Sequence, residues 1–359
     1  MVKHFDKAST MSSAESLRVD AEQSRSIKTP PEQQKEEETL EASLRPRTWD
    51  EYIGQEKIKN NLRVIIDAAK SRQEPLEHLL VYGNSGLGKT TLAYVLANEM
   101  GAGIQTCSGP ALNQPGDLAA LLTNLQDGEV LFIDECHRLS RQVAEMLYSA
   151  MEDFKLHLIV GKGPMARTMD LDLPHFTIIG ATTRIALLPS PLRNRFGSIF
   201  QLNFYEPKDM EEIVQRSATI LHMEISPGAV QLIAERSRFT PRVANRIVKR
   251  VRDFAQVAGS MRIEEAVCQK TFGALELDEF GLEPEDRKLL HTIVTKFQGG
   301  PVGIQTLAAS VSEEQDTIVD IYEPYLLQLG FLQRTSRGRV ATPRAYKHLG
   351  VSQNQKDLL

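Results

Sequence analysis

The chain has 359 residues, of which 41% are hydrophobic and 25% are charged, and its formal net charge is −5. These values are ordinary for a protein of two or three folded domains. The net charge does not indicate nucleic-acid binding, so such binding has to be argued from local basic patches. No run of about 18 apolar residues occurs and the N-terminus has no apolar core, so we expect neither a membrane span nor a secretory signal. The cysteines, Cys107, Cys136 and Cys268, are too far apart for a disulfide framework or a zinc site, and we predict a cytoplasmic location.

Residues 1–40 form a region of low hydrophobicity. They are rich in Ser, Gln, Lys and Glu, and they include Pro30-Pro31 and the acidic run Glu36-Glu37-Glu38. A segment of this composition buries too little apolar surface to fold by itself. We predict a disordered N-terminal tail over 1–40, with a partner-binding segment as the alternative, and a short C-terminal tail over 351–359.

Apolar runs alternate with helical patterns over residues 41–205. Short apolar runs separated by helical periods are typical of a parallel sheet with helices on both faces, an α/β architecture. The runs expected to be strands are 78–83, 103–107, 129–134, 176–182 and 199–204. The alternating segment 155–173 predicts a β-hairpin inserted into this domain.

Two smaller domains are predicted after the sheet domain. Residues 206–276 carry apolar residues at three- and four-residue spacing, which predicts an all-helical domain. Residues 279–350 give helical segments followed by two short strands around Arg337-Gly338-Arg339. Helices followed by a basic hairpin are typical of a winged helix–turn–helix domain.

The strongest motif is Gly83-Asn84-Ser85-Gly86-Leu87-Gly88-Lys89-Thr90. It matches the P-loop pattern and lies between a predicted strand and a predicted helix, where glycines let backbone N–H groups approach phosphates. Lys89 is placed to contact the β- and γ-phosphate oxygens, and the Thr90 hydroxyl is placed to ligate Mg²⁺. The motif therefore predicts ATP and Mg²⁺ as ligands.

A predicted apolar strand after the P-loop ends in Asp134 and Glu135. In a P-loop protein such a pair suits metal-assisted hydrolysis, in which Asp134 holds Mg²⁺ and Glu135 orients or activates the attacking water. Cys136 and His137 follow directly, and two adjacent ligand-type residues suggest a metal site as an alternative. Because they lack partners at zinc spacing, we favour a structural role for both.

Two later motifs have open interpretations. Thr182 and Thr183 end the next predicted strand, and they either point toward the γ-phosphate or act as turn residues. Arg193 and Arg195 lie together in segment 190–197, and they either stabilise phosphoryl-transfer charge, often from a neighbouring subunit, or form a solvated pair.

Basic residues cluster in two segments that lack acidic residues, 236–252 and 331–350. In the first, Arg242 follows Pro241 at a predicted helix start, and it either contacts nucleotide or belongs to a solvated face. The second segment includes the predicted wing, with Arg334, Arg337, Arg339, Arg344 and Lys347. The preceding helix carries Asp316, Asp320 and Glu323. An acidic helix is poorly suited to a DNA groove, so we expect the wing to contact DNA through phosphates.

Over residues 44–350 the chain resembles the RuvB family, the bacterial motors that drive branch migration of Holliday junctions. The P-loop and a series of shorter motifs carry the resemblance in register. These motifs are Leu44-Arg45-Pro46, Thr240-Pro241-Arg242 and segments 52–55, 116–120, 131–134, 150–154, 180–184, 190–197, 299–303, 323–326, 330–335 and 337–339.

The resemblance implies an AAA+ ATPase with a large sheet domain (41–205), a small helical lid (206–276) and a winged-helix head (279–350). It also implies a homohexameric ring that hydrolyses ATP with Mg²⁺ and pumps duplex DNA through Holliday junctions in recombination and repair. The ring is expected to work with the junction-binding protein RuvA, docked through hairpin 155–172, and with the resolvase RuvC.

Site residues follow from the resemblance position by position. The implied catalytic residues are Lys89, Asp134, Glu135, Thr183 and Arg195, with Thr183 as the γ-phosphate sensor and Arg195 as a finger that acts on the neighbouring subunit. The implied Mg²⁺ ligands are Thr90 and Asp134. The implied nucleotide-binding residues are Leu44, Arg45, Gly86, Gly88, Lys89, Thr90, Thr91, Glu152, Asp153, Phe154, Arg195, Tyr205 and Arg242. The implied DNA contacts are Gln315, Arg334 and Arg339.

The chain departs from the family pattern at several positions. Asn84-Ser85 stands where Pro-Pro is usual, and backbone N–H groups still complete the phosphate cradle. Phe239 replaces the glycine usual before Thr240, which is expected to affect how the lid helix starts. Gln315 stands where a DNA-contacting arginine is usual, and because glutamine releases no counterion we expect weaker DNA binding.

We therefore predict an ATP-driven DNA translocase. Another AAA+ role, such as a clamp loader or a protein remodeller, is one alternative, and the basic wing argues against it. A non-hydrolysing DNA-binding scaffold is the other, and the intact Lys89, Asp134, Glu135 and Arg195 argue against it.

Overall fold

The computed structural model describes residues 42–160 and 167–352, and the chain divides into two units, residues 1–45 and 46–359. The predicted tail over 1–40 lies outside the described residues, as do residues 353–359 and the hairpin tip 161–166. Within the described residues, no helix is both long enough and apolar enough to cross a membrane.

A parallel sheet forms the centre of the large domain, which confirms the predicted architecture. Its strands, in spatial order, are β2 (Ile104–Ser108), β3 (Val130–Asp134), β6 (Thr177–Thr182), β1 (Leu79–Tyr82) and β7 (Ser198–Gln201). The middle strands are almost wholly buried, because a parallel sheet is covered on both faces. The loops after β1, β3 and β6 leave the sheet at one edge, and ligands of such sheets bind at this edge.

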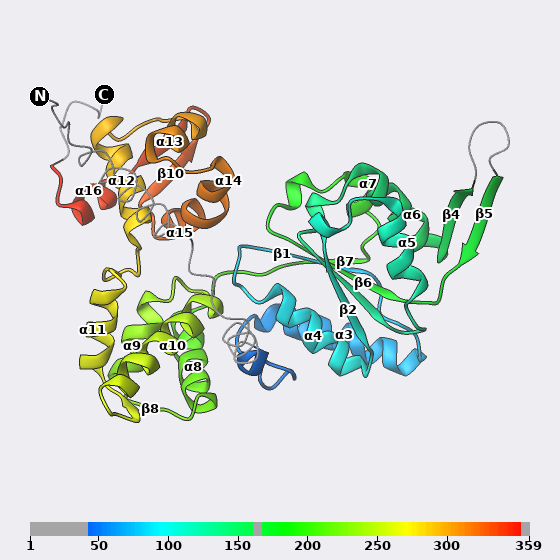
Figure 1. Cartoon of the computed structure of the whole chain (residues 1–359), viewed down its shortest axis with the longest axis horizontal. Coiled ribbons are helices and arrows are strands. Elements are labelled where there is room, and N and C mark those ends of the chain that lie inside the picture. The colour runs from blue at the N-terminus through cyan, green and yellow to red at the C-terminus, as the bar shows by residue number, and fades with distance from the viewer. Residues whose placement is uncertain (1–41, 161–166, 353–359) are drawn as a thin grey trace, which may run out of the picture. The chain divides into compact units, whose positions relative to one another are not determined.

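Helices cover both faces of the sheet (Figure 1). On one face lie α3 (Glu56–Arg72) and α4 (Lys89–Met100), and on the other lie α5 (Pro115–Thr123), α6 (Arg141–Asp153) and α7 (Ser190–Arg193). The second face has a continuous apolar core in which Leu131, Leu147 and Phe176 are each at most 1% exposed. Leu147 of α6 and Leu192 of α7 are both buried in this core, and Arg195 follows α7.

The predicted hairpin is present as β4 (Lys155–Val160) and β5 (Arg167–Asp172), which pair antiparallel with Lys155 opposite Asp172. The two strands leave the sheet domain as a ribbon after α6 (Figure 1). Leu156 is buried at the base of the ribbon, whereas Met169 is 50% exposed.

The lid is helical, with α8 (Pro207–Ile220), α9 (Pro227–Arg236), α10 (Pro241–Val257) and α11 (Glu265–Ala274), and a short parallel pair, β8 (Glu224–Ile225) and β9 (Arg262–Ile263). Proline occupies the first position of α8, α9 and α10, where its fixed φ suits a helix start. Phe239 has φ 53°, in the left-handed region that favours glycine, and α10 nevertheless starts at Pro241. The glycine replacement therefore leaves the helix start in place.

The head contains α12 (Pro284–Lys296), α13 (Ile304–Val311), α14 (Gln315–Thr317), a short π-helix (Ile318–Tyr322), α15 (Glu323–Gln328), the hairpin β10 (Leu332–Thr335) and β11 (Gly338–Ala341), and α16 (Pro343–Leu349). Its own core includes Leu290, Leu326 and Phe331, all fully buried. Helices that pack on a terminal hairpin confirm the winged-helix prediction.

Lid and head are joined by a buried ion pair. Arg238 of the lid donates to Asp286 of the head at 2.7 Å, and the two side chains are 8% and 0% exposed. The Arg238 guanidinium lies 4.7 Å from the ring centre of Tyr325, and the Phe239 ring contacts the same tyrosine edge to face. Burial raises the pKa of Asp286, and the facing guanidinium opposes that rise.

Candidate nucleotide-binding site

The P-loop connects β1 to α4 in a conformation that requires glycine. Gly83 has φ 149°, and a Cβ added there would lie 2.5 Å from the carbonyl oxygen of Leu202. Gly88, with φ 94°, caps the N-terminus of α4. Lys89 and Thr90 therefore occupy the first turn of a helix whose free N–H groups favour an anion.

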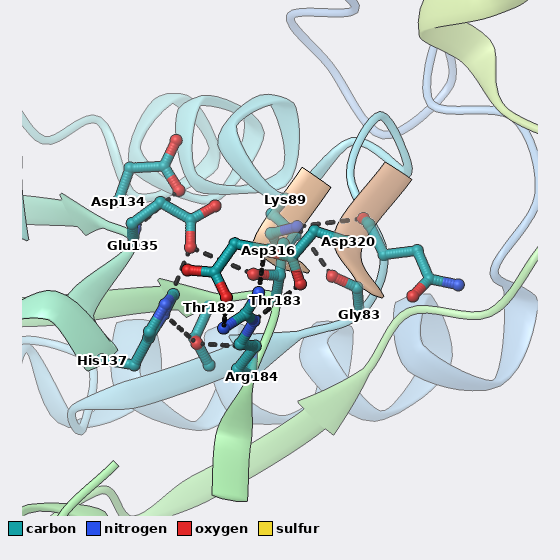
Figure 2. Close-up of polar contacts among 11 residues, drawn as sticks. Gly83, Lys89, Asp134, Glu135, His137, Thr182, Thr183, Arg184, Asp316 and Asp320 are labelled. Carbon is teal, nitrogen blue, oxygen red and sulfur yellow. Dashed lines mark hydrogen bonds and ion pairs between the residues drawn. The ribbon is translucent and has the colours of Figure 1, made fainter. Parts of the chain in front are cut away.

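The Lys89 ammonium group lies inside the loop. It donates to the backbone oxygens of Gly83 and Asn84 at 2.8 and 3.0 Å, and the residue is 7% exposed (Figure 2). Burial lowers the pKa of Lys89, and the carboxylates of Glu135 and Asp134 oppose this shift. A cation held by two neutral carbonyl groups can exchange them for phosphate oxygens, which form stronger bonds to it.

The acidic pair lies at the end of β3, on the same edge of the sheet (Figure 2). Asp134 Oδ1 accepts from the backbone N–H of Glu135, and Glu135 has a left-handed backbone with φ 49°. Thr183 donates its hydroxyl to Glu135 Oε2 at 3.2 Å. The predicted water-activating carboxylate and the predicted γ-phosphate sensor are thus in direct contact.

Thr182 and His137 lie behind this contact. The Thr182 side chain is fully buried and lies 2.8 Å from His137 Nδ1, which is also 3.2 Å from Glu135 Oε2. Burial lowers the pKa of His137, so the neutral ring is favoured. Of the two threonines left open by the sequence, Thr183 faces the carboxylate and Thr182 supports it through His137.

The oxygen donors fit a hard cation held together with a nucleotide. Among residues 42–160 and 167–352, no group of three or more His, Cys, Asp or Glu side chains is placed to hold a metal ion. Mg²⁺ needs few protein ligands, because phosphates and water complete its shell. The Thr90 hydroxyl and the Asp134 carboxylate are donors of the right chemistry at this edge.

Two predicted pocket residues, both far beyond the P-loop in sequence, contact it. Tyr205 donates its hydroxyl to the Leu87 oxygen at 3.2 Å, and burial raises its pKa to about 12. Arg242 donates to the Ser85 hydroxyl at 3.0 Å, a bond that the usual proline would not allow. Tyr52 also lies here, 3.3 Å from a Cβ added at Gly88, although only its family motif marked it in the sequence. Leu44 and Arg45 belong to the unit 1–45, so their role at the pocket stays a prediction.

Arg195 lies at the opposite edge of the sheet from the P-loop. It donates to Glu152 and to the Pro191 oxygen, each at 2.9 Å, and its guanidinium lies 4.6 Å from the ring centre of Tyr148. Arg195, Glu152 and Tyr148 line an open hollow of about 570 Å³ together with Asp153. Glu152, Asp153 and Phe154 end or follow α6 on this side.

The separation of the two edges follows from strand direction. Gly197 donates its backbone N–H to the oxygen of His78, which precedes β1, whereas the P-loop follows β1. β1 has four residues at about 3.3 Å each, so about 13 Å of strand separates the two ends. Within one chain, therefore, Arg195 and its neighbours lie away from Lys89.

The residues predicted to contact DNA differ in exposure. Gln315 is exposed at the start of α14, and the Arg334 side chain is 61% exposed. Arg339 is buried, and its guanidinium binds Glu323 Oε2 at 2.7 and 3.2 Å. A phosphate would have to displace this buried carboxylate to bind Arg339, and its role as a DNA contact stays a prediction.

Comparison with known proteins places this geometry in a family. Three family models match in succession: the Holliday junction DNA helicase RuvB P-loop domain over 44–202, the RuvB AAA lid domain over 205–278 and the RuvB C-terminal winged helix domain over 279–350. The chain belongs to the RuvB family. A Holliday junction branch migration complex subunit RuvB of Chloroflexus aggregans is 58% identical over 91% of this chain and 94% of that protein.

Other RuvB relatives agree. The RuvB subunit of Dehalococcoides mccartyi is 57% identical over 89% of this chain and 91% of its own. A solved structure, the Thermotoga maritima RuvB Holliday junction branch migration motor, matches with a TM-score of 0.80 and 49% identity. The match covers 86% of this chain and 99% of the Thermotoga maritima chain, so the RuvB fold extends through all three domains.

Proposed function

We propose that this chain is the ATP-hydrolysing DNA translocase of a Holliday-junction branch-migration complex. The observation that carries the proposal is the contact of Thr183 with Glu135 beside Lys89 at one edge of the sheet. Arg195 lies at the other edge, where it is available to a second subunit. Membership of the RuvB family, with relatives named as branch-migration subunits, supports the DNA substrate.

Each side chain has a proposed part in hydrolysis. Lys89 and the P-loop N–H groups bind the β- and γ-phosphates, and Thr90 and Asp134 provide oxygen ligands for Mg²⁺, which neutralises phosphate charge when bound. Glu135 orients the attacking water and accepts its proton, while Thr183 contacts the γ-phosphate. Arg242 and Tyr205 close the pocket from the lid side.

The second subunit completes the site in this proposal. Arg195 of one subunit stabilises the charge that develops on the phosphates held by the next, with Glu152, Asp153 and Phe154 on the same face. Head-to-tail interfaces of this kind form a ring when the rotation between subunits closes, and the family resemblance indicates a homohexamer around duplex DNA. RuvA, docked through the 155–172 ribbon, and RuvC are the proposed partners, in the cytoplasm.

The decisive experiment is ATP-dependent dissociation of a synthetic four-way junction with RuvA present. Glu135→Gln is the matched control, because it keeps the shape of the side chain and removes the carboxylate. We expect the wild type to split the junction and the variant to fail. Hydrolysis without junction splitting would limit the proposal to an ATPase, and absence of both would overturn it.

A further inference from the structure

Three carboxylates of the head, Asp316, Asp320 and Glu323, lie in one short stretch that the proposed function does not use. Glu323 binds Arg339 inside the wing. Asp316 and Asp320 instead face Arg184, the residue directly after Thr183 (Figure 2). The acidic stretch thus contacts the nucleotide edge of the large domain on one side and the wing on the other.

The contact with Arg184 is a two-pronged ion pair. Arg184 Nε and Nη2 donate to the two carboxylate oxygens of Asp320 at 2.6 Å each, and Nη1 donates to Asp316 at 3.0 Å. The side chains of Arg184 and Asp320 are 21% and 31% exposed, whereas that of Asp316 is 78% exposed. A planar guanidinium that matches a carboxylate in this way fixes orientation, which a lysine would not do.

The backbone of Arg184 lies at the catalytic edge, the edge of the sheet that carries Lys89, Glu135 and Thr183. Its N–H donates to Thr182 Oγ1 at 3.0 Å, and Thr182 contacts His137, which lies against Glu135. Every residue of β6 is buried, and Arg184 follows this strand after one residue. The backbone of Arg184 is therefore held close to the end of the strand. The peptide that carries Arg184 is thus connected by hydrogen bonds to the residues predicted to contact the γ-phosphate and the attacking water.

The head side of the contact is also placed to transmit a shift. Asp320 lies in the short π-helix Ile318–Tyr322, a type of helical irregularity frequent at functional sites. Glu323 follows directly and holds Arg339 of the wing. The carboxylate gripped by Arg184 and the carboxylate that supports the wing are thus on one continuous helical stretch.

We propose that Arg184 is a positioning residue that couples the nucleotide bound at Thr183 and Glu135 to the DNA affinity of the head, through Asp320. This inference rests on the proposed function, because it requires that the site binds nucleotide and the head binds DNA. It adds the route between them. Binding free energies of two coupled sites must change each other by the same factor, so the coupling is measurable without hydrolysis.

The test measures duplex DNA affinity of the full chain by fluorescence anisotropy with no nucleotide, with ADP and with the slowly hydrolysed ATPγS. Wild type should show at least about a fivefold difference between nucleotide states, the lower end of ordinary allosteric couplings. In Arg184→Ala and Asp320→Ala the difference should fall below about twofold. Arg138→Ala, which removes an exposed cation from the same edge, is the matched control and should keep the wild-type difference.

Two further readouts separate coupling from simple loss of structure. Nucleotide affinity without DNA should stay within about twofold of wild type in Arg184→Ala, because the Arg184 side chain is bonded to Asp316 and Asp320 and not placed in the P-loop. Asp320→Ala removes an anion that acts on Lys89, so its nucleotide affinity should not fall below that of wild type. Hydrogen exchange over residues 315–329 should respond to ATPγS in wild type and not in Arg184→Ala. Sedimentation under the same conditions shows whether each variant assembles as wild type does.

The outcomes are distinct. Collapse of the nucleotide effect in both variants but not in Arg138→Ala supports the inference. A persistent effect in Arg184→Ala, or no effect in wild type that binds both ligands, overturns it. A wild type that binds no nucleotide overturns the proposed function itself, which the nucleotide titration reveals separately.

Discussion

The catalytic edge of the sheet and the wing of the head both present cations, but they hold them differently. Lys89 is bonded to backbone carbonyl groups, and Arg195 is bonded to a carbonyl group and to the half-exposed Glu152. In the wing, Arg339 is buried with Glu323, whereas Arg334 is 61% exposed and lies 3.9 Å from the other oxygen of the same carboxylate. A cation on neutral or exposed partners can transfer to a phosphate, whereas a cation in a buried ion pair leaves an uncompensated carboxylate behind. The partner of an arginine therefore decides whether it can bind a ligand.

The largest expected effect tests the exchangeable cation Arg195. Arg195→Ala should lower ATP hydrolysis by about 10³-fold or more, the range of trans-acting arginines, while ATP affinity stays near wild type. Arg193→Ala is the matched control from the same segment and should keep most turnover. Steady-state phosphate release and nucleotide titration measure the two quantities.

Mixing subunits sharpens the same prediction. Arg195→Ala and Glu135→Gln proteins are each expected to be inactive, but a mixed ring contains interfaces with an intact Glu135 and an intact Arg195. Hydrolysis should therefore reappear on mixing. Failure of every mixing ratio to restore turnover would contradict the trans role of Arg195.

The next effect tests Arg339, the cation buried with Glu323. Arg339→Ala should lower the free energy of unfolding of the head by about 3–5 kcal/mol, because buried Glu323 is left with only the long 3.9 Å ion pair to the exposed Arg334. Arg339→Met combined with Glu323→Leu removes both charges and should be nearly neutral. Urea denaturation followed by circular dichroism provides the measurement, and Arg334→Ala, expected within about 0.5 kcal/mol of wild type, is the control. Equal loss in the single and double variants would show that the ion pair is unimportant.

A smaller effect concerns the exposed residues of the head. Arg334→Ala should reduce the slope of log affinity for duplex DNA against log salt by about 0.9, the value for one phosphate contact. Gln315→Arg should increase the slope by the same amount, because it adds a cation at an exposed helix start. Anisotropy titrations at several salt concentrations measure both slopes, and unchanged slopes would place the DNA contact elsewhere.

The smallest effect concerns His78, at the end of β1 away from the P-loop. His78 Nδ1 accepts from the N–H of Ile178 at 2.9 Å, and Nε2 lies 3.1 Å from the Met151 oxygen. This arrangement suits the neutral ring, and burial lowers the pKa of His78 from 6.5. Below pH 6.5 the unfolded chain therefore binds a proton that the folded chain does not.

The contribution of His78 to the free energy of unfolding should thus be fully present above about pH 6.5. At lower pH it should fall, by at most about 1.36 kcal/mol per pH unit. His78→Gln, which can donate and accept at the same positions, should flatten that dependence in urea denaturation between pH 5 and 6.5. The exposed His291→Gln is the control and should leave the slope unchanged.

The sequence was sufficient where function follows from local backbone pattern. The P-loop and the pair Asp134-Glu135 each end an apolar strand, and strands of a parallel sheet bring such ends together. Thr182 and Thr183 could not be separated in the same way, because the choice depends on strand register and on the contact with His137. The fold class and the winged head were predicted for the same local reasons.

Long-range pairing was not predictable. Glu323 lies 16 residues from Arg339, and Asp320 lies 136 residues from Arg184. No local pattern indicates that an acidic helix serves two arginines in different domains. Phe239 is a case in which the local pattern is overridden. Its packing against Tyr325 accompanies a left-handed backbone that a phenylalanine rarely adopts.

The ion pair between Arg238 and Asp286 has a consequence for dissecting the chain into fragments. An isolated head, residues 279–350, would keep Asp286 but lose Arg238, the cation that pairs with it and helps to cover it in the whole chain. It would also lack the guanidinium and the ring that cover Tyr325. The smallest autonomous fragment that contains the head should therefore begin before α8 and include the lid, and expression trials designed on domain boundaries alone would cut through a shared core.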